Sequence, residues 1–246
     1  MFGRLTSLRS GRPGRRAELG PVAPDRPVTA IADIHGCDDL LARALARAQD
    51  QDMSQIICVG DYVDRGPDSA GVLRRLAGRD DVICLMGNHE EMMLDFLQAP
   101  ERAGPRWLRA GGRATLASFG IDLPDEVPAA ALEEIRDRLR AAMGAPLEAW
   151  LSALPSLWHS GNLLVSHAGA DPRRAVQAQR PRDLRWGHAD LGKIPRRDGL
   201  WVLRGHVVYE DPFIEAGVIS IDTGAYATGR LTLAHIAEGG IRFAQV

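Results

Sequence analysis

Short apolar runs alternate with helical patterns along the chain from residue 28 onward. Three of these runs, VTAIADI (28–34), QIICVG (55–60) and VICLMG (82–87), have the length and the β-branched content of buried strands. After the first two runs, apolar residues recur at the spacing of one helix face, and after the third we expect a helix that begins near Glu90. This βαβαβα series predicts parallel strands joined by right-handed crossovers.

The strand alternation stops over residues 99–160, which we expect to form a helical insertion. An apolar stripe at helical spacing supports this and consists of Leu132, Ile135, Leu139 and Ala142. The stripe begins after Pro128 and ends at Gly144, as a helix with ordinary ends does. We expect it to pack in a core rather than to bind a partner.

Beyond residue 200 the sequence predicts four strands separated by short turns. They are LWVLRGH (200–206), GVISIDTGA (217–225), RLTLAHIAE (230–238) and IRFAQV (241–246). Together with the first three runs, they indicate a protein of the α/β class.

The composition is that of an ordinary globular protein. With 246 residues, 45% of them hydrophobic and 25% charged, the chain can form one large domain or one domain with an inserted subdomain. A net charge of -2 argues against a basic nucleic-acid binder, and no apolar run reaches the roughly 20 residues of a membrane span. We therefore expect a soluble protein without a nucleic-acid partner, and the oligomeric state stays open.

The cysteines Cys37, Cys58 and Cys84 form no CxxC pair. Each lies in or beside an apolar run, where cysteine serves as a small buried hydrophobe. This pattern favours a reducing compartment, and we expect a cytoplasmic location.

The first 26 residues differ from the rest, because arginines alternate with Gly, Ser and Pro and no acid occurs before Glu18. We expect a disordered Arg-rich tail over residues 1–26, since so few apolar residues cannot offset the entropy of ordering. Contact with an anionic surface or nucleic acid, and organelle targeting, are the alternatives.

Charged turns follow the first three strands, in DIHG (33–36), GDYVDRG (60–66) and GNHE (87–90). Open α/β sheets bind ligands at the carboxyl ends of their strands, where these turns meet. The side chains delivered there are Asp33, His35, Asp61, Asp64, Arg65, Asn88, His89 and Glu90. Carboxylate, imidazole and amide oxygen suit a divalent metal such as Mn, Fe or Zn. A helix-capping aspartate or a lone histidine explains one such motif, but not three in succession.

These three motifs, followed by SHAG (166–169) and RGH (204–206), resemble the calcineurin-like metallophosphoesterases. The wording is most similar to the PPP-type phosphoprotein phosphatases, including their bacterial and phage members. The resemblance extends over about residues 28–236 and implies an αββα sandwich of two mixed sheets flanked by helices. The metallophosphoesterase domain would then cover residues 27–246 and include the helical insertion.

The resemblance also implies a site for two divalent metal ions, for which manganese is our first expectation and iron or zinc the alternatives. Asp33 and His35 would hold the first metal, and Asp61 would bridge both. The second metal would be completed by Asn88, His167 and His206. Both distant histidines again follow apolar, strand-like runs.

Three further residues of the motifs would act on the substrate by the same resemblance. His89 would protonate the leaving oxygen, and Asp64 would accept a hydrogen bond from its ring. Arg65 would bind the phosphate through its planar fork. The metals would deliver a hydroxide that attacks phosphorus directly, without a covalent phosphoenzyme.

The chain departs from the family around DLRWGHAD (183–190), where many bacterial members have a second phosphate-binding arginine and this sequence has His188. Arg185 is our candidate for substrate binding beside Arg65 and Asn88. The alternatives that stay open are Arg196, Arg197 and Arg204. Val207 replaces the threonine that usually follows the last histidine, which removes a hydroxyl near His206.

The segment WLRAGGRATLASFG (107–120) resembles a glycine-containing stretch near the cleft of bacterial members. Trp107, Arg109 and Arg113 could contact substrate there, but Trp107 could equally pack the insertion. The remaining histidines are expected to be structural or exposed, and they are His159, His188 and His235. Asp222 and Thr223 fit a turn at the end of a strand.

Taken together, the motifs predict a metal-dependent phosphomonoesterase, in the first place a serine/threonine protein phosphatase. The substrate would be a phosphoprotein or a small phosphoester. The enzymatic alternative is a symmetrical dinucleoside tetraphosphate hydrolase, whose second motif usually lacks the YVDRG wording. A binding module that kept only the fold is the non-enzymatic alternative, and the complete set of predicted ligands argues against it.

Overall fold

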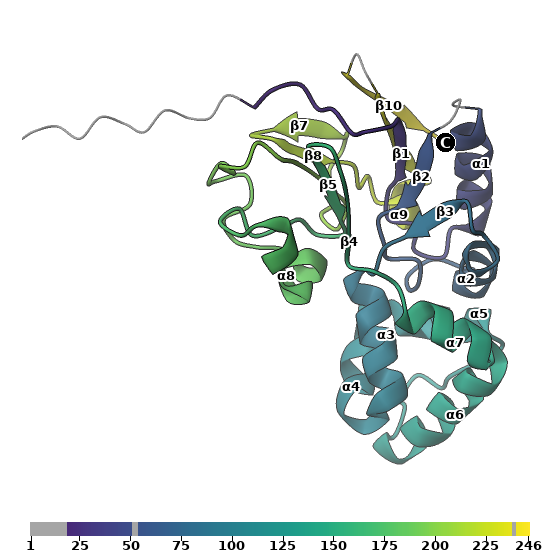
Figure 1. Ribbon diagram of the computed structural model, residues 1–246. Coiled ribbons are helices and arrows are strands. Elements are labelled where there is room, and N and C mark those ends of the chain that lie inside the picture. Colours follow the sequence, from purple (N-terminus) through teal and green to yellow (C-terminus); the bar gives the residue numbers. More distant parts are fainter. Residues whose placement is uncertain (1–18, 51–53, 238–239) are drawn as a thin grey trace, which may run out of the picture.

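The computed structural model describes residues 19–50, 54–237 and 240–246. Within these residues the strands form two five-stranded sheets packed face to face (Figure 1). The first has the order β10-β9-β1-β2-β3 and consists of β1 (Val28–Ile31), β2 (Gln55–Cys58), β3 (Val82–Cys84), β9 (Thr232–Ala237) and β10 (Gly240–Gln245). The second has the order β4-β5-β6-β8-β7 and consists of β4 (Leu157–Ser160), β5 (Leu163–Ser166), β6 (Trp201–Arg204), β7 (Phe213–Glu215) and β8 (Val218–Ser220).

Both sheets are mixed, as the sequence predicts. In the first sheet β1, β2 and β3 are parallel, and β9 and β10 continue it in antiparallel pairing. In the second, β5, β6 and β8 are parallel, with antiparallel β4 and β7 at the edges. Because parallel strands end at the same edge, the three charged turns of the sequence are brought together there.

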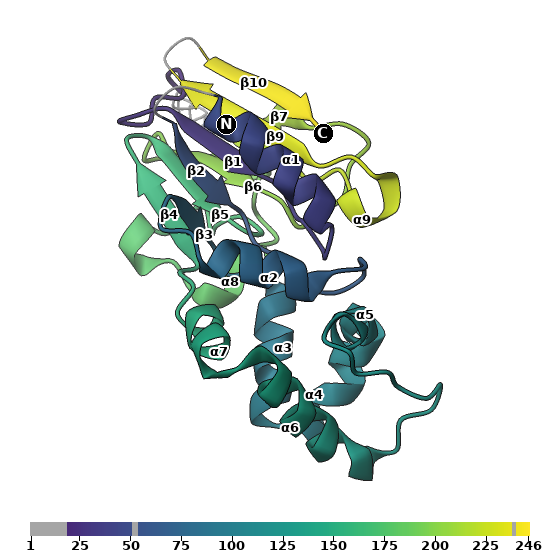
Figure 2. The same cartoon turned by 90° about the vertical axis from the view of Figure 1, so that its right-hand side faces the viewer.

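The main core lies between the two sheets and includes Ile31 and Ile57 from the first and Leu203 and Ile219 from the second. Two helices, α1 (Asp38–Gln49) and α2 (Ser69–Ala77), cover the outer face of the first sheet (Figure 2). A smaller apolar cluster joins the second sheet to α8 (Pro181–Trp186) through Leu164, Leu184 and Val202. The predicted sandwich is therefore confirmed, although a short helix and irregular chain form its fourth layer.

Helical segments between β3 and β4 gather at one end of the sheets in both views (Figures 1 and 2). They are α3 (Asn88–Gln98), α4 (Pro100–Trp107), a π-helical turn (Leu108–Gly112), α5 (Arg113–Ser118), a 3-10 turn (Ala129–Ala131), α6 (Leu132–Met143) and α7 (Ala145–Ser152). The fourth buried position of the α6 stripe is Met143, whereas the expected Ala142 is exposed. A spacing near 3.6 residues carries the stripe from Leu139 to Met143, which corrects the sequence interpretation.

The sequence did not predict the two edge strands of the second sheet, β4 and β7. Their residues are mostly half-buried or exposed, so they lack the apolar run that marks a buried strand. It also missed three short helical elements, a 3-10 turn (Val176–Ala178), α8 (Pro181–Trp186) and α9 (Ala225–Thr228). Strands and helices this short leave little periodic signal.

The tail expected over residues 1–26 lies mostly outside the described residues, and that part stays a prediction. Residues 20–25, in contrast, are attached to the second sheet. Asn162 accepts a hydrogen bond from the Ala23 amide through its side chain, at 2.6 Å, and the Trp201 indole donates to the Gly20 carbonyl. The segment just before β1 therefore belongs to the folded domain.

Two expectations from composition concern the interior and the surface. Cys58 and Cys84 are buried and Cys37 is half-buried, all as free thiols, which fits their expected use as small hydrophobes. No helix among the described residues combines the length and the apolar character needed to cross a membrane.

Candidate metal centre and substrate site

The turns after β1 and β2 are locked together by backbone hydrogen bonds. The His35 amide donates to the Asp61 carbonyl at 2.8 Å, and the Gly36 amide donates to the Tyr62 carbonyl at the same distance. At Gly66 a Cβ atom would lie 1.8 Å from the His35 carbonyl oxygen, so only glycine fits this crossing. The position of His35 relative to Asp61 is therefore fixed by the backbone.

Glu90, in the first turn of α3, holds the second of these turns from behind. Its carboxylate accepts hydrogen bonds from the backbone amides of Asp61, Tyr62, Val63 and Gly87 at 2.7–3.2 Å. Burial raises the pKa of Glu90 to about 7 even though these donors favour the charged form. The sequence placed Glu90 among the residues of the site but indicated no role for it. In the structure Glu90 is a buried anchor of the GDYVDRG turn.

Backbone strain is concentrated in the site. Six non-glycine residues among those described have positive φ, and five of them are predicted site residues: His35, Asp61, Asp64, Arg65 and His206. Residues other than glycine seldom adopt this left-handed backbone conformation. Such strain is typical of functional sites, where the surrounding fold holds the backbone in place. The backbone thus supports the site independently of its side-chain chemistry.

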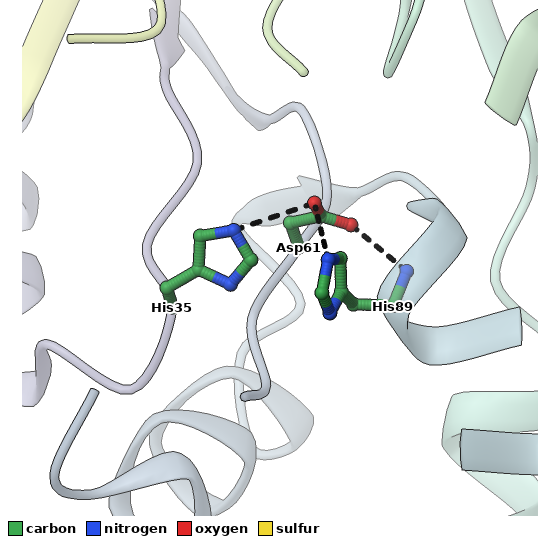
Figure 3. Close-up of side chains that lie close together, drawn as sticks. All are labelled: His35, Asp61 and His89. Carbon is green, nitrogen blue, oxygen red and sulfur yellow. Dashed lines mark hydrogen bonds and ion pairs between the residues drawn. The ribbon is translucent and has the colours of Figure 1, made fainter. Parts of the chain in front are cut away.

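On the first-sheet side, His35 Nε2 lies 3.5 Å from Asp61 Oδ2, and His89 lies on the other side of the same carboxylate (Figure 3). His35 Nδ1 donates to the Val63 carbonyl at 2.8 Å, which leaves the Nε2 lone pair directed into the site. Asp33 lies further along, where its Oδ2 accepts from the His206 amide at 2.9 Å. Its Oδ1 is buried without a hydrogen-bond partner.

On the second-sheet side, two histidines and an amide converge. His167 Nε2 lies 2.8 Å from Asn88 Oδ1, and His206 Nδ1 lies 2.9 Å from the same oxygen. The two imidazole nitrogens are 3.0 Å apart, and His167 Nε2 is 3.4 Å from Asp61 Oδ1. Asp61 is common to a cluster with His35 and His89 and to another with His167 and His206. Asn88 joins the second cluster, and Asp33 is linked to the site through its contact with the His206 amide.

The carboxylates of this site are strongly destabilised as anions. Burial raises the pKa of Asp61 to about 7. Burial, followed by repulsion from Asp222 and Asp61, raises the pKa of Asp33 well above its usual range. Buried acids close to one another favour either protonation or the presence of a cation.

The histidines are shifted in the opposite direction. Burial, with a smaller contribution from Arg204, lowers the pKa of His206 to about 4. Burial also holds the pKa of His35 and His167 well below the usual value, and neighbouring histidines add to the effect. These imidazoles are therefore neutral near pH 7, which is the state that binds metals.

The residues fit a divalent metal pair. Asp33 offers a buried oxygen that lacks a hydrogen-bond partner. On the second side, Asn88 Oδ1 and the facing nitrogens of His167 and His206 lie 2.8–3.0 Å from one another, as three ligands around one metal ion would. On the first side a cation is already present, because Arg65 donates to His35 Nε2 and to His89 Nε2, both at 3.0 Å. A metal at His35 and the Arg65 guanidinium would compete for one lone pair, so metal binding and Arg65 displacement are linked.

The His89 ring is held by a buried aspartate. Its Nδ1 donates to Asp64 Oδ2 at 2.6 Å. Trp107 Nε1 also contacts both carboxylate oxygens at 3.1 Å, and Thr115 Oγ1 donates to Oδ1 at 2.7 Å. Trp107 therefore packs in the insertion, which is one of the two roles left open for it. Its indole also contacts Asp64, the residue that accepts a hydrogen bond from His89.

Sequence reasoning missed Thr115 and Tyr226. Tyr226, on α9, places its ring 5.0 Å from the Arg65 guanidinium carbon and 5.2 Å from the His35 ring, and it is 40% exposed. It therefore forms an aromatic wall at the open side of the site. Its only sequence signal was its position just after ISIDTGA, whereas Thr115 is placed by the fold of the insertion.

The candidate arginines have different environments. Arg185 donates to Ser156 Oγ at 2.9 Å and lies 3.7 Å from Glu91, so it links α8 to α3. Arg196 is buried and donates hydrogen bonds to Asp198 and to backbone carbonyls, which indicates a structural role. Arg113 is bound to the carbonyls of Pro124 and Asp125. A substrate role for Arg185 stays a prediction.

The smaller expectations divide in a similar way. Asp222 accepts from the Gly224 amide at 2.8 Å, which confirms the expected turn. His235 contacts Thr29 Oγ1 at 3.1 Å, and His159 is exposed, as expected for residues outside the site. His188 lies 3.7 Å from Asp171 on the surface of the second sheet.

Two packed mixed sheets with clustered Asp, Asn and His at one rim define a metal-dependent hydrolase. The profile of the calcineurin-like phosphoesterases matches residues 26–210, and the chain belongs to this family of metal-dependent phosphoesterases. A binuclear metal site is typical of the family, and the clusters found here agree with it.

Similar proteins have different substrates. Serine/threonine-protein phosphatase 1 of Salmonella typhimurium is 31% identical over 227 residues, covering 86% of this chain and 92% of the relative. An asymmetrical bis(5'-nucleosyl)-tetraphosphatase, PrpE of Bacillus velezensis, is 28% identical over 82% of this chain and 86% of its own. The structure of a Saccharomyces cerevisiae protein serine/threonine phosphatase shares the fold with a TM-score of 0.60 at 16% identity, over 90% of this chain and 80% of the other.

Proposed function

We propose that the protein is a phosphomonoesterase that removes phosphate from phosphoserine or phosphothreonine in proteins. The observation that carries this proposal is the arrangement around His89. One ring nitrogen faces Asp64 at 2.6 Å, and the other faces the Arg65 guanidinium at 3.0 Å. The imidazole that would act as proton donor and a phosphate-binding fork are thus adjacent, an arrangement that suits cleavage of a phosphomonoester.

We assign Asp33, His35 and Asp61 to one metal ion and Asp61, Asn88, His167 and His206 to the other. When bound, two divalent ions supply Lewis acidity that activates water and neutralises charge on the phosphoryl group. Manganese is the metal that we expect first at both positions. Asn88 would also face the phosphate, since its amide points to the same space as the two histidines.

In this proposal Arg65 moves from the two histidines to the phosphate oxygens, which match its planar fork. His89 Nε2, freed from Arg65, would take up a proton from solvent water and pass it to the leaving oxygen. Asp64 keeps Nδ1 as the donor and stabilises the charged imidazolium. Tyr226 would contact the substrate beside Arg65.

Protein rather than nucleotide substrates are favoured by the GDYVDRG wording and by 31% identity to a serine/threonine-protein phosphatase over most of both chains. Hydrolysis of dinucleoside tetraphosphates is the second candidate. Its support is the 28% identity to PrpE, also over most of both chains.

The test is phosphate release by chelator-stripped protein before and after addition of Mn²⁺. A phosphoserine peptide and a dinucleoside tetraphosphate are compared at equal concentration. We expect turnover to depend on the metal and kcat/KM to be higher for the peptide. A higher kcat/KM for the dinucleotide would replace the first assignment by the second, and turnover of neither with metal bound would contradict both.

A further inference from the structure

Four buried side-chain polar atoms among the described residues have no hydrogen-bond partner. Two of them, Asp33 Oδ1 and His167 Nδ1, belong to the metal centre. The other two are Arg204 Nε and Ser220 Oγ, and both residues line a single cavity on the second sheet. Buried polar groups are normally paired, because an unpaired one costs about 1–3 kcal/mol. Two in one cavity indicate a missing ligand.

The strand register explains why these two side chains meet. Arg204 on β6 and Ser220 on β8 are direct neighbours in the parallel ladder. The preceding residues, Leu203 and Ile219, point into the core between the sheets. Because side chains alternate along a strand, Arg204 and Ser220 point to the opposite, outer face. The cavity therefore lies on the side of β6 turned away from the core between the sheets.

The cavity has a volume of about 320 Å³, and its polar lining consists mostly of donors. Lys193 adds an ammonium group, and the Tyr209 hydroxyl accepts from Arg204 Nη2 at 3.0 Å, which leaves its own hydrogen available. Glu215 is the acidic residue in the lining, and it is exposed to solvent. Arg204, Lys193, Ser220 and Tyr209 together match an oxyanion, and two of these residues carry the buried, unpaired Nε and hydroxyl groups.

Part of the wall is apolar. Leu191 lies on one side, and Phe213 packs edge-on against Tyr209 with ring centroids 4.6 Å apart. A bare ion would leave these surfaces in contact with water. A ligand with a small apolar group next to the anion would cover them.

We propose that this cavity binds a phosphate group carried by a small ligand with an apolar substituent, at a site separate from the metal centre. Its position links it to that centre through the chain between β6 and β8. The loop that leaves Arg204 carries His206, whose amide donates to Asp33, and the Tyr209 amide donates to the Asp222 carbonyl at 3.0 Å. The ligand would contact the side chains of Arg204 and Tyr209, which precede and follow His206 in this part of the chain.

The sequence provides a direct probe, because Lys193 is the one lysine among 246 residues. An amine-reactive acylating reagent can modify this side chain and the α-amine of the chain, which is an internal control. Modification is followed by mass spectrometry on the metal-loaded protein. Phenylphosphonate, which the enzyme cannot hydrolyse, is the probe ligand, with inorganic phosphate, benzoate and chloride compared at equal ionic strength.

We expect phenylphosphonate to slow acylation of Lys193 about tenfold at ten times its Kd, with the α-amine unaffected. Inorganic phosphate should need a higher concentration, and chloride should have no effect. Equal protection of both amines, or no protection at all, would overturn the proposal. Stronger protection by benzoate would replace the phosphate by a carboxylate and would overturn it in its present form.

Variants separate this cavity from other anion sites. Ser220→Ala should raise the concentration needed for protection about tenfold, since one hydrogen bond to a charged group is lost. Arg204→Gln should abolish protection, and because it could also unfold the protein, the serine variant carries the test. Exposed Ser152→Ala and Arg138→Gln, on helices of the insertion, are the matched controls. Protection must survive Arg65→Gln, and its loss there would assign it to the metal centre.

Discussion

The two halves of the metal centre are built in different ways. The first sheet contributes Asp33, His35 and Asp61 on turns that follow neighbouring parallel strands and are tied together by backbone hydrogen bonds. The second sheet contributes His167 and His206, which follow β5 and β6 and are separated along the chain by a segment that contains the short helix α8 and β6 itself. Only the packing of one sheet on the other brings them to Asn88.

The halves also differ in electrostatics. Buried acids with raised pKa dominate the first half, whereas the second combines an amide with histidines of lowered pKa. Protons should therefore compete with metal mainly in the first half. Asp61, whose carboxylate contacts both halves, should couple the two.

Asp61→Asn should have the largest effect, because it removes charge from the one ligand that both halves share. Loss of a group that merely supports a metal ligand costs about 10- to 100-fold in affinity, so we expect a loss above about 100-fold here. Metal content after gel filtration and phosphatase turnover measure it. Asp95→Asn, at an exposed position of α3, is the control. Full occupancy of both sites in Asp61→Asn would contradict the shared ligand.

His89→Asn should lower kcat about 100-fold while both metals remain bound, since a general acid contributes about that much. This variant separates the proton donor from the metal clusters that it adjoins. His159→Asn, at an exposed position of β4, should leave turnover unchanged. An unaltered kcat in the His89 variant would remove the acid role.

Acidification should release the metal of the first half before that of the second. Asp61 has a pKa of about 7, so below pH 7 a proton occupies this shared ligand and the apparent affinity of both halves falls about tenfold per pH unit. Burial raises the pKa of Asp33 well above its usual range, which adds a further loss that is confined to the first half. His206, with a pKa of about 4, stays unprotonated until far lower pH. Calorimetric titration with Mn²⁺ at pH 8, 7 and 6 would show this order, and parallel weakening of both sites would contradict it.

Trp107→Phe should have the smallest effect, a loss in kcat of about tenfold, since one hydrogen bond to a charged group is worth about 1.5 kcal/mol and the other partners of Asp64 remain. Phenylalanine keeps the stacking on Phe96. The loss should shrink with p-nitrophenyl phosphate, whose leaving group needs no proton. Trp158→Phe on β4 is the control. Equal losses with both substrates would indicate general disruption of the insertion.

Sequence reasoning predicted the first half more completely than the second. DIHG, GDYVDRG and GNHE follow strong strand signals, so parallel pairing alone placed their side chains at one edge. It predicted His167 and His206 through their resemblance to family motifs, because no local pattern links two residues on separate strands. The edge strands β4 and β7 carry too little apolar signal to be seen.

Some expectations remain predictions. They are the manganese ions, the cytoplasmic location and the tail over residues 1–18. The substrate role of Arg185 belongs with them, because its hydrogen bond to Ser156 and its proximity to Glu91 place it at the junction of α8 and α3.

The chemistry of this protein follows from its sequence, through the acids, imidazoles and arginine of its motifs and the strands that end in them. Which of these groups are buried together, and which neighbours hold them, depends on the packing of the whole chain. Thr115 and Trp107 reach Asp64, and Arg204 meets Ser220 across two strands, because packing joins segments that are distant along the chain. Local sequence patterns report only the path of each segment, whereas contacts across the core depend on all of them at once.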